Sequence, residues 1–127
     1  MKGFHINIEA ETKANTDYRR VLYTARHLQL VVMSLAPGEA IGEEVHHLDQ
    51  FIRIESGSVT AVLDGESFEV ATEHAIVIPE GVKHNIINTG ADVAKLYSIY
   101  APPEHKDGTV HHTKADVTEE HFDGTVS

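Results

Sequence analysis

The sequence predicts an all-β protein, built as an antiparallel sandwich or barrel of short strands. Between about residues 18 and 100, segments rich in Val, Leu and Ile alternate with turn residues. Asp64-Gly65 is a two-residue connection of the kind that closes a β-hairpin. Convincing helical periodicity is missing before the C-terminal tail. Many short strands separated by Gly-containing turns are typical of sandwiches and barrels.

Each expected strand ends at a residue that disfavours its continuation. Pro37-Gly38 ends the second strand, Ser56-Gly57 separates the next two, and Pro79 stops a brief apolar segment. Gly90-Ala91-Asp92 separates the last two. In chain order, the expected strands cover residues 18–24, 28–36, 51–55, 58–63, 75–78, 83–89 and 93–100.

The last part of the chain is expected to leave the barrel. Pro102-Pro103 cannot continue a paired strand, because proline has no backbone N–H. In the extension that follows, Thr113 at the N-cap and Asp116 at the third helical position predict a short helix to about His121. We therefore expect one domain over residues 1–127, with a barrel core at about 18–100 and an extension at 101–127.

Composition narrows the possible functions. The chain of 127 residues has no Cys, so disulfides, thiolate catalysis, thiolate zinc sites and iron–sulfur clusters are excluded. Twenty Asp and Glu against ten Lys and Arg give a net charge of −10, the wrong sign for a nucleic-acid binder. No secretory signal or membrane-length apolar run is visible. We therefore expect a cytoplasmic protein with neither nucleic acid nor membrane as a partner.

Strand alternation points several polar side chains into the predicted barrel. After the turn Pro79-Glu80-Gly81, His84 shares a strand face with Ile86 and Asn88, which directs its imidazole inward. Glu44 and His46 are two residues apart, so in an extended segment they point to one face. These patterns predict a cluster of polar groups inside one end of the barrel.

The segment 50–55 carries one further polar residue on its apolar face. Gln50 shares its parity with Ile52 and Ile54, so burying the isoleucines places Gln50 inside the barrel. By the same alternation, Arg53 and Glu55 are predicted to be exposed on the outer face. The tail histidines, by contrast, are expected on a surface or mouth-covering segment, and they are His105, His111, His112 and His121.

These residues fall into two motifs, and through them the chain resembles the cupin superfamily. Its members share the patterns G-x5-H-x-H-x3,4-E-x6-G and G-x5-P-x-G-x2-H-x3-N. The second pattern is matched from its proline onward by Pro79, Gly81, His84 and Asn88, with Glu73 in place of its leading glycine. The resemblance implies a double-stranded β-helix, or jelly-roll barrel, of six to eight strands. It is closest to small single-domain cupins, some of which are labelled mannose-6-phosphate-isomerase-like.

The first pattern is matched with two substitutions. Gly57 closes it, and His46 takes the place of its second histidine. Gln50 stands where the family has a glutamate, and Glu44 stands where it has the first histidine. The resemblance therefore implies a metal site formed by Glu44, His46, Gln50 and His84.

Such a set offers two imidazole nitrogens and two oxygens, with room for water or substrate. It suits Mn, Fe, Ni, Co or Zn, and without a thiolate it does not favour Cu(I). Gln50 has two interpretations: it is a direct ligand, or it orients His46 by a hydrogen bond.

Three functional hypotheses follow. The first is a metal-dependent enzyme of oxygenase, isomerase or lyase type acting on a small polar organic substrate, with Glu44 as ligand and base. The second is a non-catalytic module that binds or senses a sugar or organic acid. The third is an interaction protein that uses its barrel faces. A homodimer joined through apolar outer faces is expected in any of them.

Overall fold

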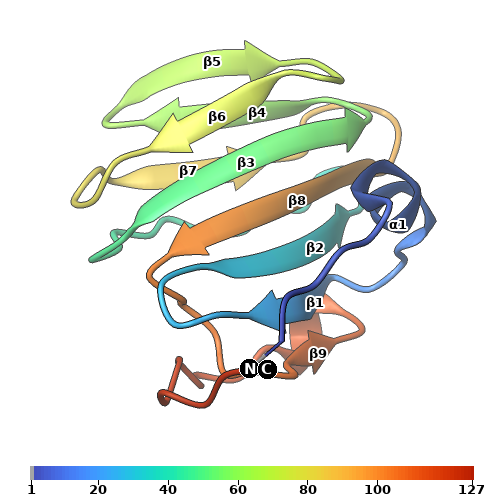
Figure 1. Ribbon diagram of the computed structural model, residues 1–127. Helices are drawn as coiled ribbons and strands as arrows, with labels where there is room; N and C mark the ends of the chain where they lie inside the picture. The colour runs from blue at the N-terminus through green and yellow to red at the C-terminus, as the bar shows by residue number, and fades with distance from the viewer. Residues whose placement is uncertain (1) are drawn as a thin grey trace.

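The computed structural model describes residues 2–127 and forms two antiparallel β-sheets that face each other (Figure 1). One sheet has the strand order β6-β3-β8-β2-β1-β9, and the other has the order β5-β4-β7. The predicted all-β fold, a double-stranded β-helix with a short C-terminal extension, is confirmed. Its strands are β1 (Arg19–Thr24), β2 (Gln29–Leu35), β3 (Asp49–Ser56), β4 (Val59–Leu63), β5 (Glu66–Val70), β6 (Ala75–Ile78), β7 (His84–Ile87), β8 (Ala94–Ala101) and β9 (Val110–His111).

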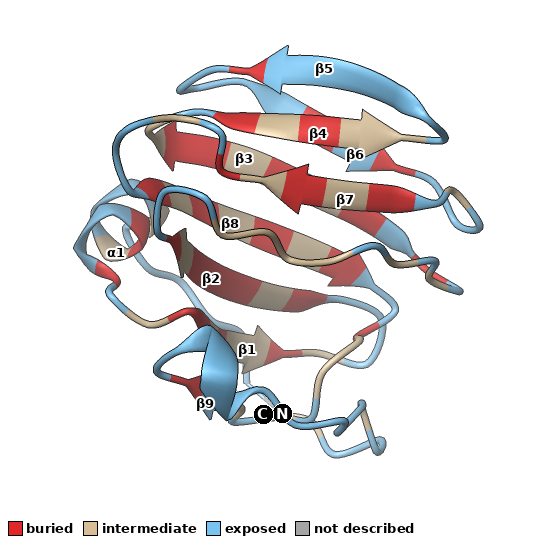
Figure 2. Ribbon diagram, turned by 180° about the vertical axis from the view of Figure 1, so that it is seen from behind, coloured by how far each residue is buried: buried red, intermediate tan, exposed pale blue. Residues whose placement is uncertain are grey.

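The core lies between the two sheets. Buried and partly buried residues alternate along β3 and β8, which appear as red and tan bands in Figure 2. Burying a large aliphatic side chain contributes about 1.5–3 kcal/mol, so this apolar face holds the sheets together. Its fully buried side chains include Met33, Leu35, Ile52, Ile54, Ile86 and Leu96.

A short helix, α1 (Ile8–Ala14), precedes the first strand and was not predicted from the sequence. The side chain of its N-cap residue, Asn7, accepts a hydrogen bond of 3.1 Å from the backbone N–H of Ala10. The helix contacts β2, β3 and β8, and Glu11 pairs with Arg20 of β1 at 2.6 Å. With only seven residues, it is too short to show a clear 3.6-residue period. No helix among residues 2–127 has the length and apolar character needed to cross a membrane.

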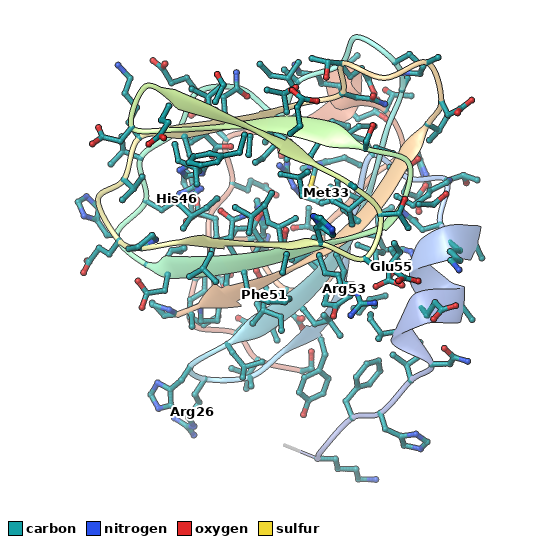
Figure 3. All side chains as sticks on the ribbon, turned by 90° about the horizontal axis from the view of Figure 1, so that it is seen from above. Arg26, Met33, His46, Phe51, Arg53 and Glu55 are labelled. Atoms are coloured by element: carbon teal, nitrogen blue, oxygen red, sulfur yellow. The ribbon has the colours of Figure 1, made fainter. Side chains whose placement is uncertain are left out.

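The prediction that Glu55 is exposed was wrong, since its side chain is only 4% exposed. The pairing of β3 with β8 shifts register between Ile54 and Ser56, and this irregularity interrupts the strict alternation of faces. Arg53, whose side chain is 37% exposed, lies beside Glu55 with Nε 2.5 Å from the carboxylate Oε1. Figure 3 shows both side chains close to α1.

The C-terminal extension folds back onto its own barrel. Residues of β9 pair antiparallel with β1, so the extension adds an edge strand to the larger sheet. Helical structure in the extension is limited to a 3-10 turn, η1 (Lys114–Asp116), and does not reach His121 as predicted. The reason is local: Val117 already has extended backbone angles (φ −60°, ψ 130°), which end the turn.

A buried glutamine fixes the start of this extension. The side chain of Gln29 donates a hydrogen bond of 2.8 Å to the carbonyl oxygen of His105 and accepts one of 3.0 Å from its N–H. The same amide donates to Thr24 Oγ1 at 2.9 Å. Because Gln29 is fully buried, these bonds hold the segment after β8 against the start of β2.

Candidate functional site

The backbone brings the two predicted motifs together at one end of the barrel. Glu44 and His84 form an isolated antiparallel bridge, with an N–H···O bond of 2.9 Å in each direction. Gly81, in the turn before β7, has φ of +84°, which glycine adopts without the steric cost that other residues bear. Its N–H donates to the carbonyl oxygen of His46 at 3.0 Å. The turn of the second motif therefore holds the backbone of the first.

Three of the four predicted ligands are neighbours. His46 Nε2 lies 3.2 Å from Glu44 Oε2, and the rings of His46 and His84 are 5.1 Å apart between centroids. His46 projects from its loop into the interior, as Figure 3 shows. Among residues 2–127, however, no three His, Cys, Asp or Glu side chains are grouped closely enough to form a metal-binding cluster by themselves.

Gln50, the fourth predicted ligand, is buried on β3 as strand parity indicated. Its amide nitrogen donates to Ser98 Oγ over a long 3.4 Å, and its amide oxygen is buried with no hydrogen-bond partner. A buried carbonyl oxygen without a partner is unfavourable, by roughly 1–3 kcal/mol. Gln50 therefore offers a free oxygen donor inside the barrel.

The donor atoms present have the chemistry that a divalent transition metal requires. The ring atom Nδ1 of His84 lies 2.9 Å from the carbonyl oxygen of Val82, which only accepts, so Nδ1 carries the hydrogen and Nε2 keeps its lone pair. The 3.2 Å between Glu44 and His46 also suits two ligands of one ion, since ligands about 2.1 Å from a common ion lie roughly 3 Å apart. These nitrogen and oxygen donors are of the types that Mn, Fe, Ni, Co and Zn accept.

The surroundings of Glu44 and His46 shift the pKa values of these two side chains in opposite directions. Burial alone raises the pKa of Glu44, but the hydrogen bond and charge of His46, with Arg19, hold that pKa below its usual value. For His46, burial acts to lower the pKa, but Glu44 and then Glu104 outweigh it and raise the pKa. Glu44 is therefore a carboxylate at neutral pH.

A cavity of about 350 Å³ adjoins Glu44, and most of the side chains that form it were not predicted. Arg19 enters it from β1, and Glu104 and His105 enter it from the segment after β8. Glu104 lies 3.5 Å from His46 Nδ1 and 3.0 Å from His121 Nδ1. The extension thus covers the mouth of the barrel above the predicted ligands.

Two aromatic rings pack beside the candidate site, the buried Tyr100 of β8 and the partly buried His105 of the extension. Tyr100 meets the rings of His46 and His105 edge-on, at centroid distances of 6.2 and 5.1 Å. Burial raises the pKa of Tyr100, and burial together with the charge of Arg19 lowers the pKa of His105 to about 2. Both groups are therefore neutral at pH 7. Among the other tail histidines, His111 is buried, whereas His112 and His121 are exposed.

One sequence pattern could have indicated that Arg19 or its neighbour points into the barrel. Arg19 and Arg20 are adjacent in an otherwise apolar strand, so alternation must turn one of them inward. For Glu104 and His105 there was no comparable signal, because their positions depend on the path of the chain beyond Pro102-Pro103. That path is set by the hydrogen bonds of Gln29 and by β9.

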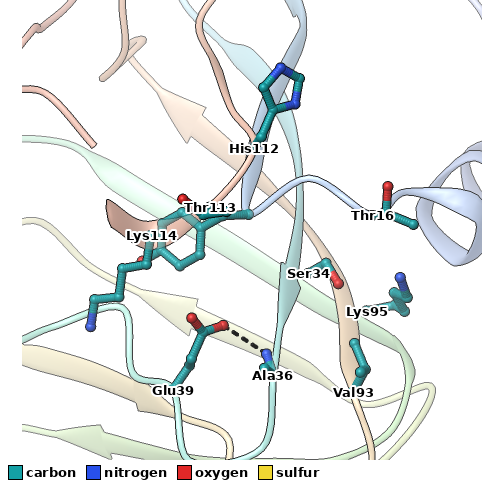
Figure 4. Close-up of a pocket in the computed structure, with 10 residues that line it drawn as sticks. Thr16, Ser34, Ala36, Glu39, Val93, Lys95, His112, Thr113 and Lys114 are labelled. Carbon is teal, nitrogen blue, oxygen red and sulfur yellow. Dashed lines mark hydrogen bonds between the residues drawn. The ribbon is translucent and has the colours of Figure 1, made fainter. Parts of the chain in front are cut away.

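A second hollow, of about 360 Å³, lies on the side of the barrel between β2, β8 and the extension (Figure 4). Glu39, on its wall, accepts a hydrogen bond of 2.8 Å from the N–H of Ala36. Lys95 and Lys114 also line it. None of the predicted ligands lines this hollow, although it shares Tyr18 and Lys114 with the wall of the candidate cavity.

Two antiparallel sheets that face each other as a double-stranded β-helix define a class, the small β-barrel proteins of jelly-roll type. Within that class the chain belongs to the cupin family, because the family model described as the cupin domain matches residues 31–100. The resemblance predicted from the two motifs is confirmed. The narrower mannose-6-phosphate-isomerase-like label stays a prediction.

Relatives support the same assignment. The chain is 49% identical to the uncharacterized protein YrkC of Bacillus subtilis (strain 168), over 91% of this chain and 66% of that protein. Thus the chain spans about two thirds of the length of this relative. The crystal structure of BH2720 from Bacillus halodurans matches with a TM-score of 0.89 and 49% identity, over 91% of this chain and 92% of that one.

More distant structures share the fold alone. KdgF from Halomonas sp. has a TM-score of 0.67 at 18% identity, over 84% of this chain and 97% of that one. At this identity the likeness establishes the barrel and says nothing of the reaction.

Proposed function

We propose that this cupin domain, residues 1–127, binds one divalent transition metal through Glu44, His46, Gln50 and His84. It then acts as a metal-dependent enzyme of oxygenase, isomerase or lyase type on a small polar organic substrate. The observation that carries the proposal is the Glu44–His46–His84 cluster beside a 350 Å³ cavity. The unpartnered oxygen of Gln50 supports it.

Each residue has a distinct role under this proposal. A bound metal of this kind supplies Lewis-acid or redox chemistry. His84 is oriented by its hydrogen bond to Val82, and Glu44, ionised at neutral pH, can accept a proton from substrate at its free oxygen. Tyr100 remains a phenol because its pKa is raised, so it can donate a hydrogen bond but not act as a base. The covering extension limits the entry of water.

A non-catalytic module that binds a sugar or organic acid is the second candidate. It is favoured by the neutral Gln50 in place of a carboxylate, which weakens metal binding. It is also favoured by His46, whose two nitrogens both face carboxylates, of Glu44 and Glu104. Thermal-shift measurements with metals, sugar phosphates and dicarboxylates separate the candidates. Stabilisation by an organic ligand only when metal is present supports the enzyme, whereas stabilisation without metal supports the module.

The metal itself is tested by elemental analysis of protein purified without an affinity tag. Near-stoichiometric transition metal is expected in the unmodified protein and in His47→Ala, because His47 is exposed and next to the site. His84→Ala should lose the metal while remaining folded. Equal metal content in His84→Ala and the unmodified protein would overturn the proposal.

The predicted homodimer remains part of this proposal. Val77 on β6 is 64% exposed and Phe68 on β5 is 44% exposed, and both line a hollow of about 290 Å³ between these two edge strands. A second copy would remove this apolar surface from water. Light scattering should report a dimer that Val77→Glu converts to a monomer. Leu28→Glu, at an exposed site in the turn after β1, should stay dimeric.

A further inference from the structure

Arg19 is a buried cation in the candidate cavity. Only 6% of this residue is exposed, and its Nε is buried with no hydrogen-bond partner. The guanidinium carbon lies 5.4 Å from the centroid of the Tyr18 ring, and Nη1 is 3.5 Å from Nδ1 of His111. Arg20, the next residue, differs: its guanidinium pairs with Glu11 at 2.6 Å and with Asp17 at 3.5 Å.

The contacts of Arg19 leave its positive charge uncompensated. Burial and then the charge of Arg19 lower the pKa of His111, so this imidazole is neutral and can accept a hydrogen bond without supplying an anion. The ion pairs found within residues 2–127 include none that involves Arg19. A buried guanidinium without a carboxylate partner is strongly unfavourable, which indicates that an anion completes this site.

Carboxylates do line the same cavity, but imidazoles already engage the nearest ones. Glu44 pairs with His46 at 3.2 Å, and Glu104 lies between His46 and His121 at 3.5 and 3.0 Å. The other basic group on the cavity wall, Lys114, donates its Nζ to the carbonyl oxygen of Ala40. Lys114 is exposed, so Arg19 is the buried cation without a carboxylate partner among the described residues that line this space.

We propose that Arg19 binds the carboxylate of a small organic acid within the cavity that adjoins Glu44. This inference rests on the proposed function and deepens it, because it assigns the class of ligand to the same site. The planar guanidinium has donors arranged to hold a carboxylate through two parallel hydrogen bonds. A volume of about 350 Å³ is near the lower end for small-molecule sites, which suits a short acid.

Local charge favours a singly charged carboxylate over a phosphate. The carboxylates of Glu43, Glu44, Glu104, Glu119 and Glu120 all line the cavity, and the lysine and arginine that oppose them are the buried Arg19 and the exposed Lys114. A dianion meets twice the repulsion that a monoanion meets in this environment. A carboxylate near Arg19 would also bring the rest of the acid beside Glu44, where the proposed chemistry takes place.

The test is calorimetric titration of the protein as purified with lactate, with lactamide as the neutral isostere and inorganic phosphate as the competing anion. Lactate should bind the unmodified protein, and lactamide should bind at least about tenfold more weakly, as expected when a charge-assisted bond is lost. Phosphate should also bind more weakly than lactate. Absence of lactate binding, or tighter binding of phosphate or lactamide, would overturn the inference.

Substitutions of Arg19 test whether lactate binds at this residue. Arg19→Gln should lower lactate affinity at least about tenfold, and Arg19→Lys, which keeps the charge but not the planar donors, should give an intermediate affinity. Arg26→Gln is the matched control, since Arg26 is exposed in the turn after β1 and points away from the barrel (Figure 3). Lactate binding to Arg19→Gln with the affinity of the unmodified protein would contradict the proposal.

Two further measurements, the melting temperature and the metal content of Arg19→Gln, distinguish ligand binding by Arg19 from a structural role of Arg19 and from the proposed metal site. Arg19→Gln should melt at the same temperature as the unmodified protein or higher, because it removes an unpaired buried charge. A marked fall in its melting temperature together with unchanged lactate affinity would show that Arg19 is structural. The metal content of Arg19→Gln should equal that of the unmodified protein. If the unmodified protein is purified without metal and still binds lactate through Arg19, only the proposed metal site is contradicted.

Discussion

The backbones of Glu44 and His84 exchange two hydrogen bonds of 2.9 Å, and this bridge joins the two sequence motifs. Glu44 lies outside the named strands and His84 is the first residue of β7, so the bridge clamps a loop to the start of β7. Because the clamp involves main-chain atoms only, side-chain substitutions at either residue leave it in place. Glu44 and His84 can therefore be replaced one at a time while the two motifs stay joined.

Removing the charge of Glu44 is expected to weaken metal binding. Glu44 is the only carboxylate of the proposed set, so Glu44→Gln should lower affinity for Mn²⁺ at least about tenfold, which corresponds to about 1.4 kcal/mol. Glu43→Gln is the matched control, because Glu43 is exposed and pairs with Lys83 at 3.3 Å. Titration of the metal-free variants measures both affinities. Equal losses in the two variants would mean that general electrostatic attraction, and not ligation by Glu44, is responsible.

Exchanging the amide of Gln50 for a carboxylate should have opposite effects on metal binding and on stability. Gln50→Glu should raise affinity for Mn²⁺, since an anionic oxygen replaces a neutral one. The metal-free variant should lose roughly 1–3 kcal/mol of stability, because the new carboxylate is buried beside Ser98 without a cation. Metal titration and denaturant unfolding measure the two effects. If the metal affinity does not change, Gln50 is not a ligand.

Gln29 is expected to control the cover over the site. Gln29→Leu removes both hydrogen bonds to the backbone of His105 and leaves its N–H and C=O unpaired. The stability cost should be about 1–3 kcal/mol. Limited proteolysis should then cut after β8 faster than in the unmodified protein. Thr24→Val, which removes only the hydroxyl that Gln29 contacts, should leave cleavage of this segment slow.

Acid should destabilise the protein in part through His105. Its pKa is lowered from 6.5 to about 2 by burial and by the charges of Arg19, His46, His111 and His121. Only the unfolded chain takes up this proton between these values, so stability is complete above pH 6.5 and falls below it. One proton gives a slope of about 1.4 kcal/mol per pH unit. In denaturant unfolding between pH 6.5 and 5, His105→Phe should therefore lose less stability than the unmodified protein.

His112 supplies a control of opposite sign. Its hydrogen bond to Asp17 raises its pKa, so its contribution is present below pH 6.5 and disappears as pH rises through the folded-state value. His112→Ala should therefore lose more stability on acidification than the unmodified protein. Parallel stability curves for His105→Phe and the unmodified protein would contradict the account of His105.

The barrel and the buried positions of two candidate ligands were predictable where strand alternation holds. His84 follows a proline–glycine turn, and Gln50 shares its face with Ile52 and Ile54, so two-residue periodicity placed both correctly inside. Glu55 was placed wrongly because a register shift changes the faces within β3. Alternation is a local rule and carries no information about such a shift.

Contacts between distant segments could not be predicted from local sequence patterns. Arg19 and His105 meet in one cavity only because β9 pairs with β1 and Gln29 holds the segment after β8. Helix α1 is similarly fixed by its partners, such as the ion pair of Glu11 with Arg20. Each depends on tertiary packing of short segments whose intrinsic preferences are weak.

The most direct measurement is the anomalous scattering of a crystal of this protein loaded with Mn²⁺. The account predicts one strong anomalous peak with Nε2 of His84, a nitrogen of His46, a carboxylate oxygen of Glu44 and the amide oxygen of Gln50 each about 2.0–2.3 Å away. A fully loaded crystal whose peak lies elsewhere, or that shows no peak between His46 and His84, would contradict the central claim.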